Sequence, residues 1–517
     1  MPTTRSISVI GITQLRVDYA GEFCKRIGLW SCAYSAPGRW QLAHCILSNL
    51  EGLKGFPKRV GILRNPDINH GLWAAQRKRE AAFEDKEPTV MVVGAGQGGL
   101  AVVARLKMLD VSTLITKKNK RVGDNWRNRY KALCLHNPVW ANQLPYFPFP
   151  SNWPVFSSAD KIAGWLEYYG EAMELNVSTS CKVSNAVRDE ALGQPQSYPD
   201  GRQRIFKNIK HIVFTTGFNG SQPNIPLFPG TDSFKGQILH SSQYKLASEY
   251  IGKKVVVIGA CTSAHDIATD LHRMGIDVTM YQRSSTYVMS AKNKLQVYFS
   301  GLLFIIRVII SLCSSYYLAL YSENSPPTDV SDLMSASFPN SFSVQGFSQQ
   351  MTDLIADMDK DLLEGLSKRG FKLNKGINGT GGMMLYLTSG AWYYLDTGAS
   401  QLIIDRKIKL KSDRLLQSFT EKGLRFEDGS EIPADVVVYT TGEGFITSYG
   451  DAHTVICQIC GDQVAKQRKD VWGLNAEGEL RGSWRDMGVP GLFYTMVFGS
   501  SNQGDGRKEF WTEIFES

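Results

Sequence analysis

The feature that most constrains the fold is a pattern that occurs twice: an apolar strand, a small-residue turn, a helix and a second strand. The first copy is "TVMVVGAGQGGLAVVARLKMLDVSTLIT" and the second is "KKVVVIGACTSAHDIATDLHRMGIDVTMYQRSS". Short apolar strands that alternate with helices are typical of parallel sheets. With 517 residues the chain is long enough for two or three domains. The pattern therefore predicts an α/β protein built on two strand–helix–strand units.

The first turn carries three glycines at the spacing GxGxxG. Gly94 permits the tight turn, Gly96 lets a pyrophosphate approach the backbone, and Gly99 lets the helix pack closely on the strand. The helix N-terminus then faces the anion. This arrangement predicts a Rossmann-like dinucleotide site, with a purely structural turn as the alternative.

The second turn is a weaker match, because Cys261 and Ala264 stand where two of the glycines would be. Both replacements are small, and the strand and helix around them are clear. The strand that follows ends on Arg283 and Ser284, where an acid would favour an unphosphorylated ribose. A guanidinium with hydroxyl donors suits a 2′-phosphate, so NADPH is expected rather than NADH. An exposed arginine at a strand end is the alternative.

The first unit departs from the dinucleotide pattern at its second strand, which ends on Lys117 instead of an acid. Losing a charge-assisted bond to the ribose costs about 1.5–3 kcal/mol. That corresponds to roughly 10- to 150-fold in affinity. The site is expected to be weakened without being abolished, with Thr116 supplying a neutral hydrogen bond in partial compensation.

Composition excludes several classes of protein. The chain is 43% hydrophobic and 21% charged, as folded proteins are. A net charge of +8 suits anionic cofactors, and no cluster of Lys and Arg with interleaved aromatics indicates nucleic-acid binding. Nine scattered cysteines give no disulfide framework, and the N-terminus has no secretory pattern, so a cytoplasmic location is expected. The one CxxC, Cys457 to Cys460, is interpreted as chance.

Between the two units, "FKGQILHSSQY" places Phe234, Gly236, His240 and Tyr244 at the spacing FxGxxxHxxx(Y/F). This is the fingerprint of flavin-dependent monooxygenases of the flavin-containing monooxygenase type. The chain resembles that family, particularly its fungal branch, over roughly residues 88–295 and 325–490. A tyrosine at the last position resembles N- or S-oxygenating and plant-type members more than typical Baeyer–Villiger enzymes.

The resemblance implies that the first turn holds FAD and the second holds NADPH, with no metal. His136 and Asn137 are candidates for the face of the flavin ring. His240 joins these two as a catalytic candidate, although a structural role is favoured for it. The residues implied in cofactor binding are Gly94, Gly96, Gly99, Lys117, Asp124, Trp126, Arg127, Leu144, Thr216, Gly217, Gly259, Cys261, Ser263, Arg283, Ser284 and Gly442.

The activity implied by the resemblance is hydride transfer from NADPH to FAD, followed by reaction of the reduced flavin with O2. A flavin C4a-hydroperoxide would then deliver one oxygen to a small organic substrate, as in a tailoring step of secondary metabolism. The alternative is a degenerate member that keeps the fold and binds FAD weakly. A disulfide reductase would need a CxxC beside the flavin, where Cys134 stands alone. A membrane-anchored binding protein would rest only on the apolar segment 297–321.

The expected domains are an N-terminal α+β extension (1–87), an FAD domain in two parts (88–225 and 386–517) and an inserted NADPH domain (226–385). Residues 297–321 carry a single charge, Arg307, and are long enough to span a bilayer. A span is not expected, because strands on both sides of this segment should share one sheet. Two interpretations remain, contact with a membrane interface and non-native sequence from an unspliced intron. The polar C-terminal stretch 498–517 is also atypical of the family.

Overall fold

The structure is a computed structural model in which part of the chain is described. For residues 9–17, 24–34, 42–53 and 194–197 it gives the course of the backbone in strands. The other described residues are 55–186, 203–217, 223, 225–294, 321–323, 325–336, 340, 346, 348–389, 393–441 and 452–495.

The first parallel sheet has the order β21-β10-β4-β5-β6. Its strands are β4 (Val90–Val93), β5 (Thr113–Thr116), β6 (Val177–Ser178), β10 (His211–Phe214) and β21 (Leu492–Tyr494). Alternate residues of β4 face opposite sides of the sheet, as the period of a strand requires.

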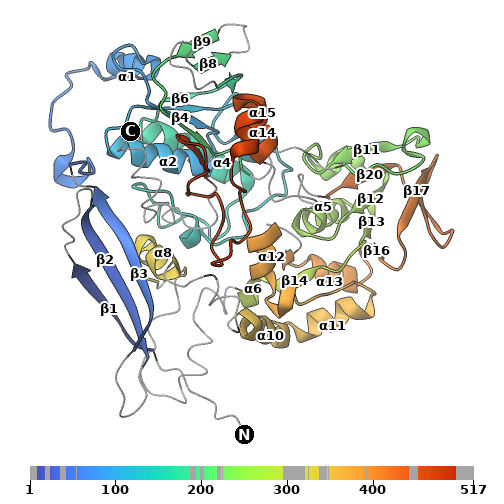
Figure 1. Cartoon of the computed structure of the whole chain (residues 1–517). Coiled ribbons are helices and arrows are strands. Elements are labelled where there is room, and N and C mark those ends of the chain that lie inside the picture. The colour runs from blue at the N-terminus through green and yellow to red at the C-terminus, as the bar shows by residue number, and fades with distance from the viewer. Residues whose placement is uncertain are drawn as a thin grey trace.

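The two faces of this sheet are covered by helices from different parts of the chain. Val90 and Val92 share a core cluster with residues of α2 (Gln97–Met108) and α4 (Ala159–Ala172). Met91 and Val93 share another with α14 (Ala452–Cys460). Figure 1 shows α14 beside the first sheet although it lies far along the sequence. Burial on both faces explains why these strands are continuously apolar.

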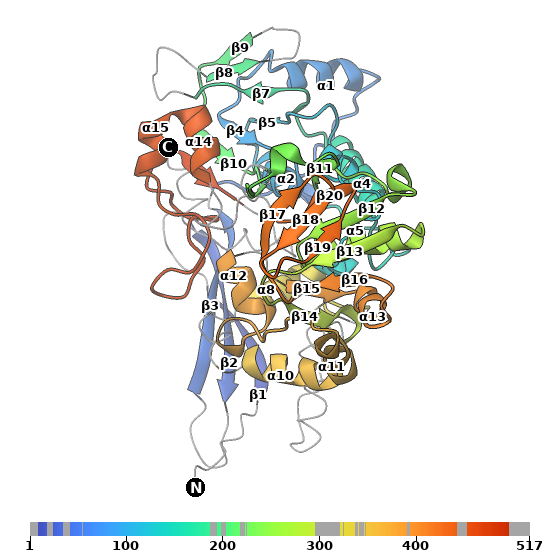
Figure 2. The same ribbon diagram turned by 90° about the vertical axis from the view of Figure 1, so that its right-hand side faces the viewer.

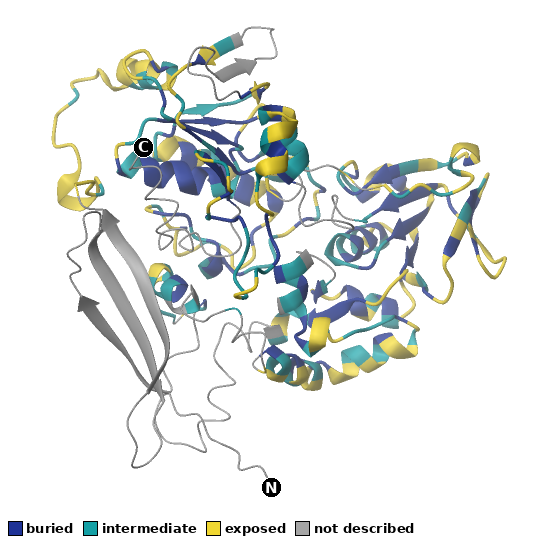
Figure 3. Cartoon of the chain, in the orientation of Figure 1, coloured by how far each residue is buried: buried dark blue, intermediate teal, exposed yellow. Residues whose placement is uncertain are grey.

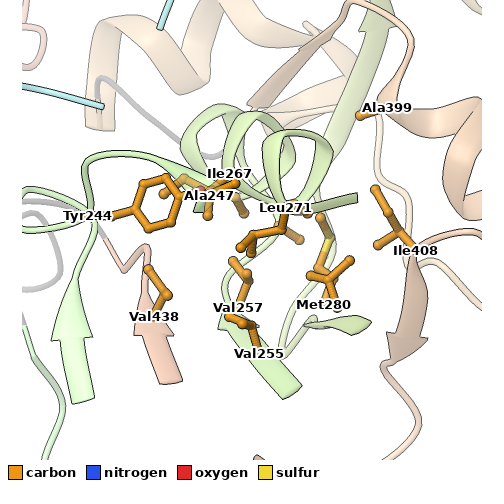
Figure 4. Packing of buried hydrophobic residues seen from close by; sticks show 14 of the residues in the cluster. Tyr244, Ala247, Val255, Val257, Ile267, Leu271, Met280, Ala399, Ile408 and Val438 are labelled. Atoms are coloured by element: carbon orange, nitrogen blue, oxygen red, sulfur yellow. The ribbon is translucent and has the colours of Figure 1, made fainter. Parts of the chain in front are cut away.

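The second parallel sheet has the order β11-β20-β12-β13-β16. Its strands are β11 (Gln237–His240), β12 (Lys254–Ile258), β13 (Asp277–Tyr281), β16 (Lys409–Lys411) and β20 (Val436–Tyr439). Helix α5 (Thr262–Arg273) packs on one face, with Ile267 and Leu271 above Val255, Val257 and Met280 (Figure 4).

The other face of the second sheet is covered by a small antiparallel sheet. Its strands are β17 (Leu416–Thr420), β18 (Gly423–Phe426) and β19 (Glu431–Pro433), which lie in front of the parallel sheet in Figure 2. Phe419, Leu424 and Phe426 share a core cluster with Val256 and Val437. The turn between β18 and β19 contains Gly429, which has φ +79°.

The remaining elements lie around these two units, and Figure 3 shows that the buried residues concentrate in the two sheets and the helices on them. Three antiparallel strands come first in the chain: β1 (Val9–Val17), β2 (Cys24–Tyr34) and β3 (Leu42–Leu53). The others are α1 (Trp73–Ala82), α3 (Asp124–Arg127), β7 (Lys182–Val183), β8 (Gln194–Ser197), β9 (Gln203–Phe206), β14 (Tyr287–Ser290), α6 (Ala291–Lys294), α8 (Thr328–Ala336), α10 (Ser348–Met358), α11 (Lys360–Lys368), α12 (Gly382–Ser389), β15 (Tyr393–Asp396), α13 (Ala399–Ile404) and α15 (Asp462–Gln467).

The strand pairing shows the expected α/β architecture, in which an inserted unit separates two parts of the first unit. The return to the first unit differs from the boundary expected at residue 386. Strands β16 and β20 pair with β13 and β12, so the segment 409–439 belongs to the second sheet. Helix α14 and strand β21 complete the first unit. Strands β10 and β20 each follow a small antiparallel sheet, and both are apolar. The sequence alone does not say which parallel sheet each of them joins.

The apolar segment lies largely outside the described residues, which stop at Lys294 and resume at Tyr321. Strands on either side of it do share one sheet, as expected. Within the described part of the chain, no helix is both long and apolar enough to cross a membrane. The atypical stretch 498–517 also lies outside the described part.

Candidate functional site

The first glycine turn follows β4 at the carboxyl edge of the sheet. Gly94 has φ +116°, and a Cβ on Gly99 would lie 1.9 Å from the Gly94 carbonyl oxygen. Thr215, just after the neighbouring strand β10, donates its hydroxyl to the Val93 carbonyl at 3.1 Å. These contacts leave no room for side chains at either glycine, so the helix starts directly under the strand.

The space beside Gly96 is open. A Cβ at this position would meet only the Asn125 amide nitrogen, at 3.8 Å. Gly96 is the N-cap of α2, and the first turn of that helix carries no acidic residue. The positive end of the helix is therefore uncompensated by its own side chains, which suits a pyrophosphate. The backbone half of the predicted FAD site fits its ligand.

The ribose end of this site is occupied by a cation. Lys117 is 8% exposed, and its ammonium donates to the Asn125 side-chain oxygen at 3.1 Å. Burial, together with Lys118, lowers the pKa of Lys117 to about 8, while Asp124 opposes that shift. The expected compensation by Thr116 is wrong, because its hydroxyl is buried and donates to the Val92 carbonyl at 3.4 Å.

The segment "RVGDNWR" forms the short helix α3 beside this turn. Arg127 pairs with Asp124 at 3.1 Å and with Glu167 of α4 at 2.6 Å. These two predicted binding residues thus hold each other and the neighbouring helix. Trp126 differs, since its indole nitrogen is buried without a hydrogen-bond partner in the described part of the protein. A buried orphan donor at this place fits a ligand acceptor.

The second turn repeats the geometry of the first. Gly259 has φ +132°, and a Cβ there would lie 2.2 Å from the hydroxyl of Thr440. Thr440 follows β20 and donates to the Ile258 carbonyl at 2.8 Å. Cys261 is the N-cap of α5, in place of a glycine. Each turn is therefore closed by the first threonine of a Thr-Thr-Gly sequence, Thr215 of 215–217 and Thr440 of 440–442. The sequence interpretation missed this role.

The predicted 2′-phosphate site lies at the carboxyl end of β13. Arg283 and Ser284 are exposed, and the Arg283 guanidinium makes no ion pair with the described residues. Lys372 reaches the same place and donates to the Arg283 carbonyl at 3.1 Å. Asn374 donates to the Ser285 hydroxyl at 3.0 Å. Two cations and exposed hydroxyls at one strand end suit a dianion.

A buried polar cluster joins the two units. Tyr130 follows α3 and is fully buried, and its hydroxyl donates to Asp266 of α5 at 2.9 Å. The same hydroxyl lies 3.4 Å from the Ser263 hydroxyl, in the second turn. The other carboxylate oxygen of Asp266 lies 3.8 Å from the His136 Nε2. Burial raises the pKa of Asp266 to about 6. Neither Asp266 nor Tyr130 was singled out in the sequence, although the acid is visible in "CTSAHD".

The flavin-side candidates are only partly brought together. His136 and Asn137 are half-buried, and the Asn137 carbonyl accepts from Asn142 at 3.0 Å. Leu144 is buried in the core of the first unit. Tyr494 of β21 lies 3.3 Å from the Thr216 hydroxyl and donates to the carbonyl of Gly217. Gly442 lies outside the described residues.

The fingerprint residues have structural roles. His240 is 1% exposed, and its Nδ1 accepts from the backbone N–H of Ser242 at 3.2 Å. A Cβ on Gly236 would lie 2.4 Å from the Asp435 carbonyl oxygen. Tyr244 donates to Asp270 of α5 at 2.8 Å. This geometry supports the structural role favoured for His240.

Comparison with known proteins agrees with this geometry. Residues 87–321 match the family described as flavin-binding monooxygenase-like. This match supports an oxidoreductase of the flavin-dependent monooxygenase class.

Two plant proteins extend the similarity beyond that region. The indole-3-pyruvate monooxygenase YUCCA1 of Oryza sativa subsp. japonica is 28% identical over 369 residues, which cover 71% of this chain and 79% of the relative. A probable indole-3-pyruvate monooxygenase YUCCA4 of Arabidopsis thaliana is 28% identical over 356 residues, covering 69% and 75%. The resemblance to the fungal branch is not supported by these plant relatives.

A solved structure shows the same fold. Cyclohexanone monooxygenase from Rhodococcus sp. Phi1, bound to NADP+, superposes with a TM-score of 0.51 at 16% identity. The match covers 81% of this chain and 82% of that one. At this identity the likeness concerns the fold of the two dinucleotide-binding units.

Proposed function

We propose that the protein is an FAD- and NADPH-dependent monooxygenase that transfers one oxygen atom of O2 to a small organic substrate. The observation that carries this proposal is the repeated geometry of the two glycine turns. Each lies at the carboxyl edge of a parallel sheet and is closed by a threonine, Thr215 or Thr440, from the adjacent strand. Ligands bind at such edges in open α/β sheets.

The assignment of cofactors to turns follows from the charges. The second turn leads to Arg283 and Lys372, which would bind the 2′-phosphate of NADPH. At the first turn, Gly96 and the start of α2 would hold the FAD pyrophosphate, and the Trp126 indole would donate to the same cofactor. FAD supplies the chemistry, accepting a hydride and activating O2. The chain's own residues bind it, orient it and keep water away.

The side chains nearest the junction of the units would define the substrate side. His136 and Asn137 lie on the segment that Asp266 contacts, and would face the flavin ring. We propose a small molecule of secondary metabolism as the substrate. We also propose that the protein is cytoplasmic and belongs to the fungal branch of the family. We propose an N-terminal extension (1–87), a first part of the FAD domain (88–225) and an NADPH domain that begins at residue 226. The second part of the FAD domain begins after β20. Contact of 297–321 with a membrane interface remains part of the proposal.

One observation favours a second function, a degenerate member that binds FAD weakly. The Lys117 ammonium stands where a ribose-binding acid is usual, and its partner in the described structure is a neutral amide. A carboxylate would accept from both ribose hydroxyls, whereas an ammonium has only donors. Weak binding of FAD would leave the NADPH turn intact.

The visible spectrum of the purified protein separates these two functions. A monooxygenase shows flavin absorbance as purified or after addition of FAD and gel filtration. It then oxidises NADPH in air and releases hydrogen peroxide, and a true substrate raises the first rate and lowers the second. A colourless protein that gains no flavin absorbance contradicts the enzyme proposal and supports the degenerate one.

A further inference from the structure

We propose that Asp266 is a positioning residue that couples NADPH binding at the second turn to the placement of the segment 128–137. The inference rests on the proposed use of NADPH and adds a role for a residue that neither glycine turn contains. Its basis is the set of contacts that Asp266 makes across the junction of the two units.

Asp266 lies in α5, soon after the helix start at Thr262, and its side chain is 10% exposed. A buried carboxylate needs hydrogen-bond donors or cations around it. The titratable and charged groups around it come from three elements. They are Tyr130, His136, Arg129 and Cys134 from the segment 128–137, Arg273 from α5 itself and Tyr394 from β15.

Asp266 contacts both ends of this segment. One carboxylate oxygen accepts from Tyr130 at 2.9 Å, and the other lies 3.8 Å from His136 Nε2. A single carboxylate that contacts two residues of one loop fixes its orientation more strongly than one contact could. The loop carries His136 and Asn137, the flavin-side candidates.

Tyr130 links the segment 128–137 to the proposed nucleotide site. The Tyr130 hydroxyl lies between Asp266 and Ser263, and Ser263 belongs to the turn at the N-terminus of α5. An anion bound at this helix end attracts the hydroxyl and backbone donors of the turn. Movement of the Ser263 hydroxyl toward a phosphate changes its contact with the Tyr130 hydroxyl. The hydrogen bond between Tyr130 and Asp266 then changes, and with it the position of the segment 128–137.

A matched control exists one helical turn further along α5. Asp270 is also a carboxylate that accepts from a buried tyrosine, since Tyr244 donates to it at 2.8 Å. Asp270 accepts in addition from the backbone of Ala247 at 3.1 Å. The two sites have the same chemistry on the same helix, but among the described residues no hydrogen bond or ion pair joins Asp270 to the segment 128–137. Removal of Asp270 therefore reproduces the loss of a buried carboxylate from α5, and it reaches the segment only through the edge-on contact of the Tyr244 and Tyr130 rings.

Hydrogen exchange measured by mass spectrometry tests the proposal on the full chain, with and without saturating NADP+. The amides of Leu133 and Leu135 report on the segment, since they donate backbone hydrogen bonds to Tyr130 and Ser157. In the wild type, NADP+ should slow their exchange by about five-fold or more, a typical lower bound for coupling between sites. Asp266→Ala and Tyr130→Phe should lose this slowing, and Asp270→Ala should keep it.

The outcomes are separable. Slowing that persists in Asp266→Ala, or that is lost equally in Asp270→Ala, overturns the coupling. Thermal melting and NADP+ titration calorimetry on each variant identify one that has simply failed to fold, and Tyr130→Phe keeps the ring in place as a second test. Absence of NADP+ binding in the wild type overturns both this inference and the proposed use of NADPH. Binding without any change in exchange overturns the coupling alone.

Discussion

At the scale of single residues, Lys117 is the side chain that most alters the expected chemistry. It is buried beside a turn built for a pyrophosphate, and the cost of burial lowers its pKa to about 8. Its ammonium still carries a charge at neutral pH. The local structure thus favours the phosphates of a dinucleotide and disfavours the ribose contact usual in FAD sites.

Replacing Lys117 by Glu should tighten FAD binding by roughly 10-fold or more, because the carboxylate accepts hydrogen bonds from the ribose. The measurement is a fluorescence titration of FAD against the apoprotein. Lys118→Glu is the control, since Lys118 is exposed and changes the net charge equally. Weaker binding in Lys117→Glu would show that Lys117 itself binds the cofactor, and unchanged binding would show that position 117 does not contact the ribose.

Arg283 is the residue that should decide between the two nicotinamide cofactors. Its replacement by Ala should raise the KM for NADPH by about 10- to 150-fold, the effect of one charge-assisted bond, and leave the KM for NADH unchanged. Steady-state oxidation of both cofactors measures the ratio. Lys372→Ala should have a smaller effect in the same direction, because Lys372 also donates to the Arg283 carbonyl. An equal loss with both cofactors would contradict a phosphate contact.

At the scale of elements, the sequence predicts those parts of the fold that depend on one strand and the helix next to it in the chain. The glycine turns and the two helices after them are local, and their spacing and periodicity predict them. Pairing between distant strands is not local, so the place of β20 in the second sheet was not predicted. The Thr440 hydroxyl shows why, since it matters only once β20 lies beside β12.

The same limit applies to the site. The glycines and Arg283 carry recognisable spacing, whereas Asp266 and Tyr130 meet only through the packing of α5 against a distant loop. The effect of Thr116 was predicted wrongly for a related reason. The sequence shows a hydroxyl at the strand end but does not show that the hydroxyl points toward Val92.

Helix α5 should give the protein a measurable dependence of stability on pH. The pKa of Asp266 is raised from 3.8 to about 6, so between these values the folded state holds a proton that the unfolded state has lost. The free energy of unfolding therefore falls as pH rises from about 4 to about 6, by about 3 kcal/mol for this group.

Asp266→Asn should remove this part of the slope. Urea denaturation at a series of pH values gives the difference between the wild type and the variant, which cancels the contribution of the other carboxyl groups. Asp270→Asn serves as the comparison on the same helix. A difference between wild type and Asp266→Asn that stays constant with pH would contradict the raised pKa.

At the scale of the whole molecule, the second parallel sheet contains strands that come before and after the apolar segment 297–321 in the chain. Strands before it and after it pair directly, as β13 does with β16 and β12 with β20. The pairing of these strands does not involve residues 297–320 themselves. The segment should therefore be dispensable to the fold, whatever its own origin.

Replacing residues 297–320 by a Gly–Ser sequence of equal length should leave the protein folded and its NADP+ affinity unchanged within about threefold. Circular dichroism and NADP+ titration check this, and vesicle flotation shows whether binding to lipid is lost with the segment. A variant of the same length with the apolar residues shuffled is the control. Loss of folding only in the Gly–Ser variant would show that the segment packs as native sequence.

The late position of β21 has a consequence for synthesis on the ribosome. Tyr494 of β21 bonds beside Thr216, which lies 278 positions earlier in the chain. Until β21 emerges, β10 is an open edge of the first sheet, and at about 5–20 residues per second that wait lasts on the order of 15–55 seconds. An open, apolar strand edge is a template for association with other chains. Nascent chains should therefore depend on chaperones during this interval, and codon changes that slow the last third of translation should lower the soluble yield.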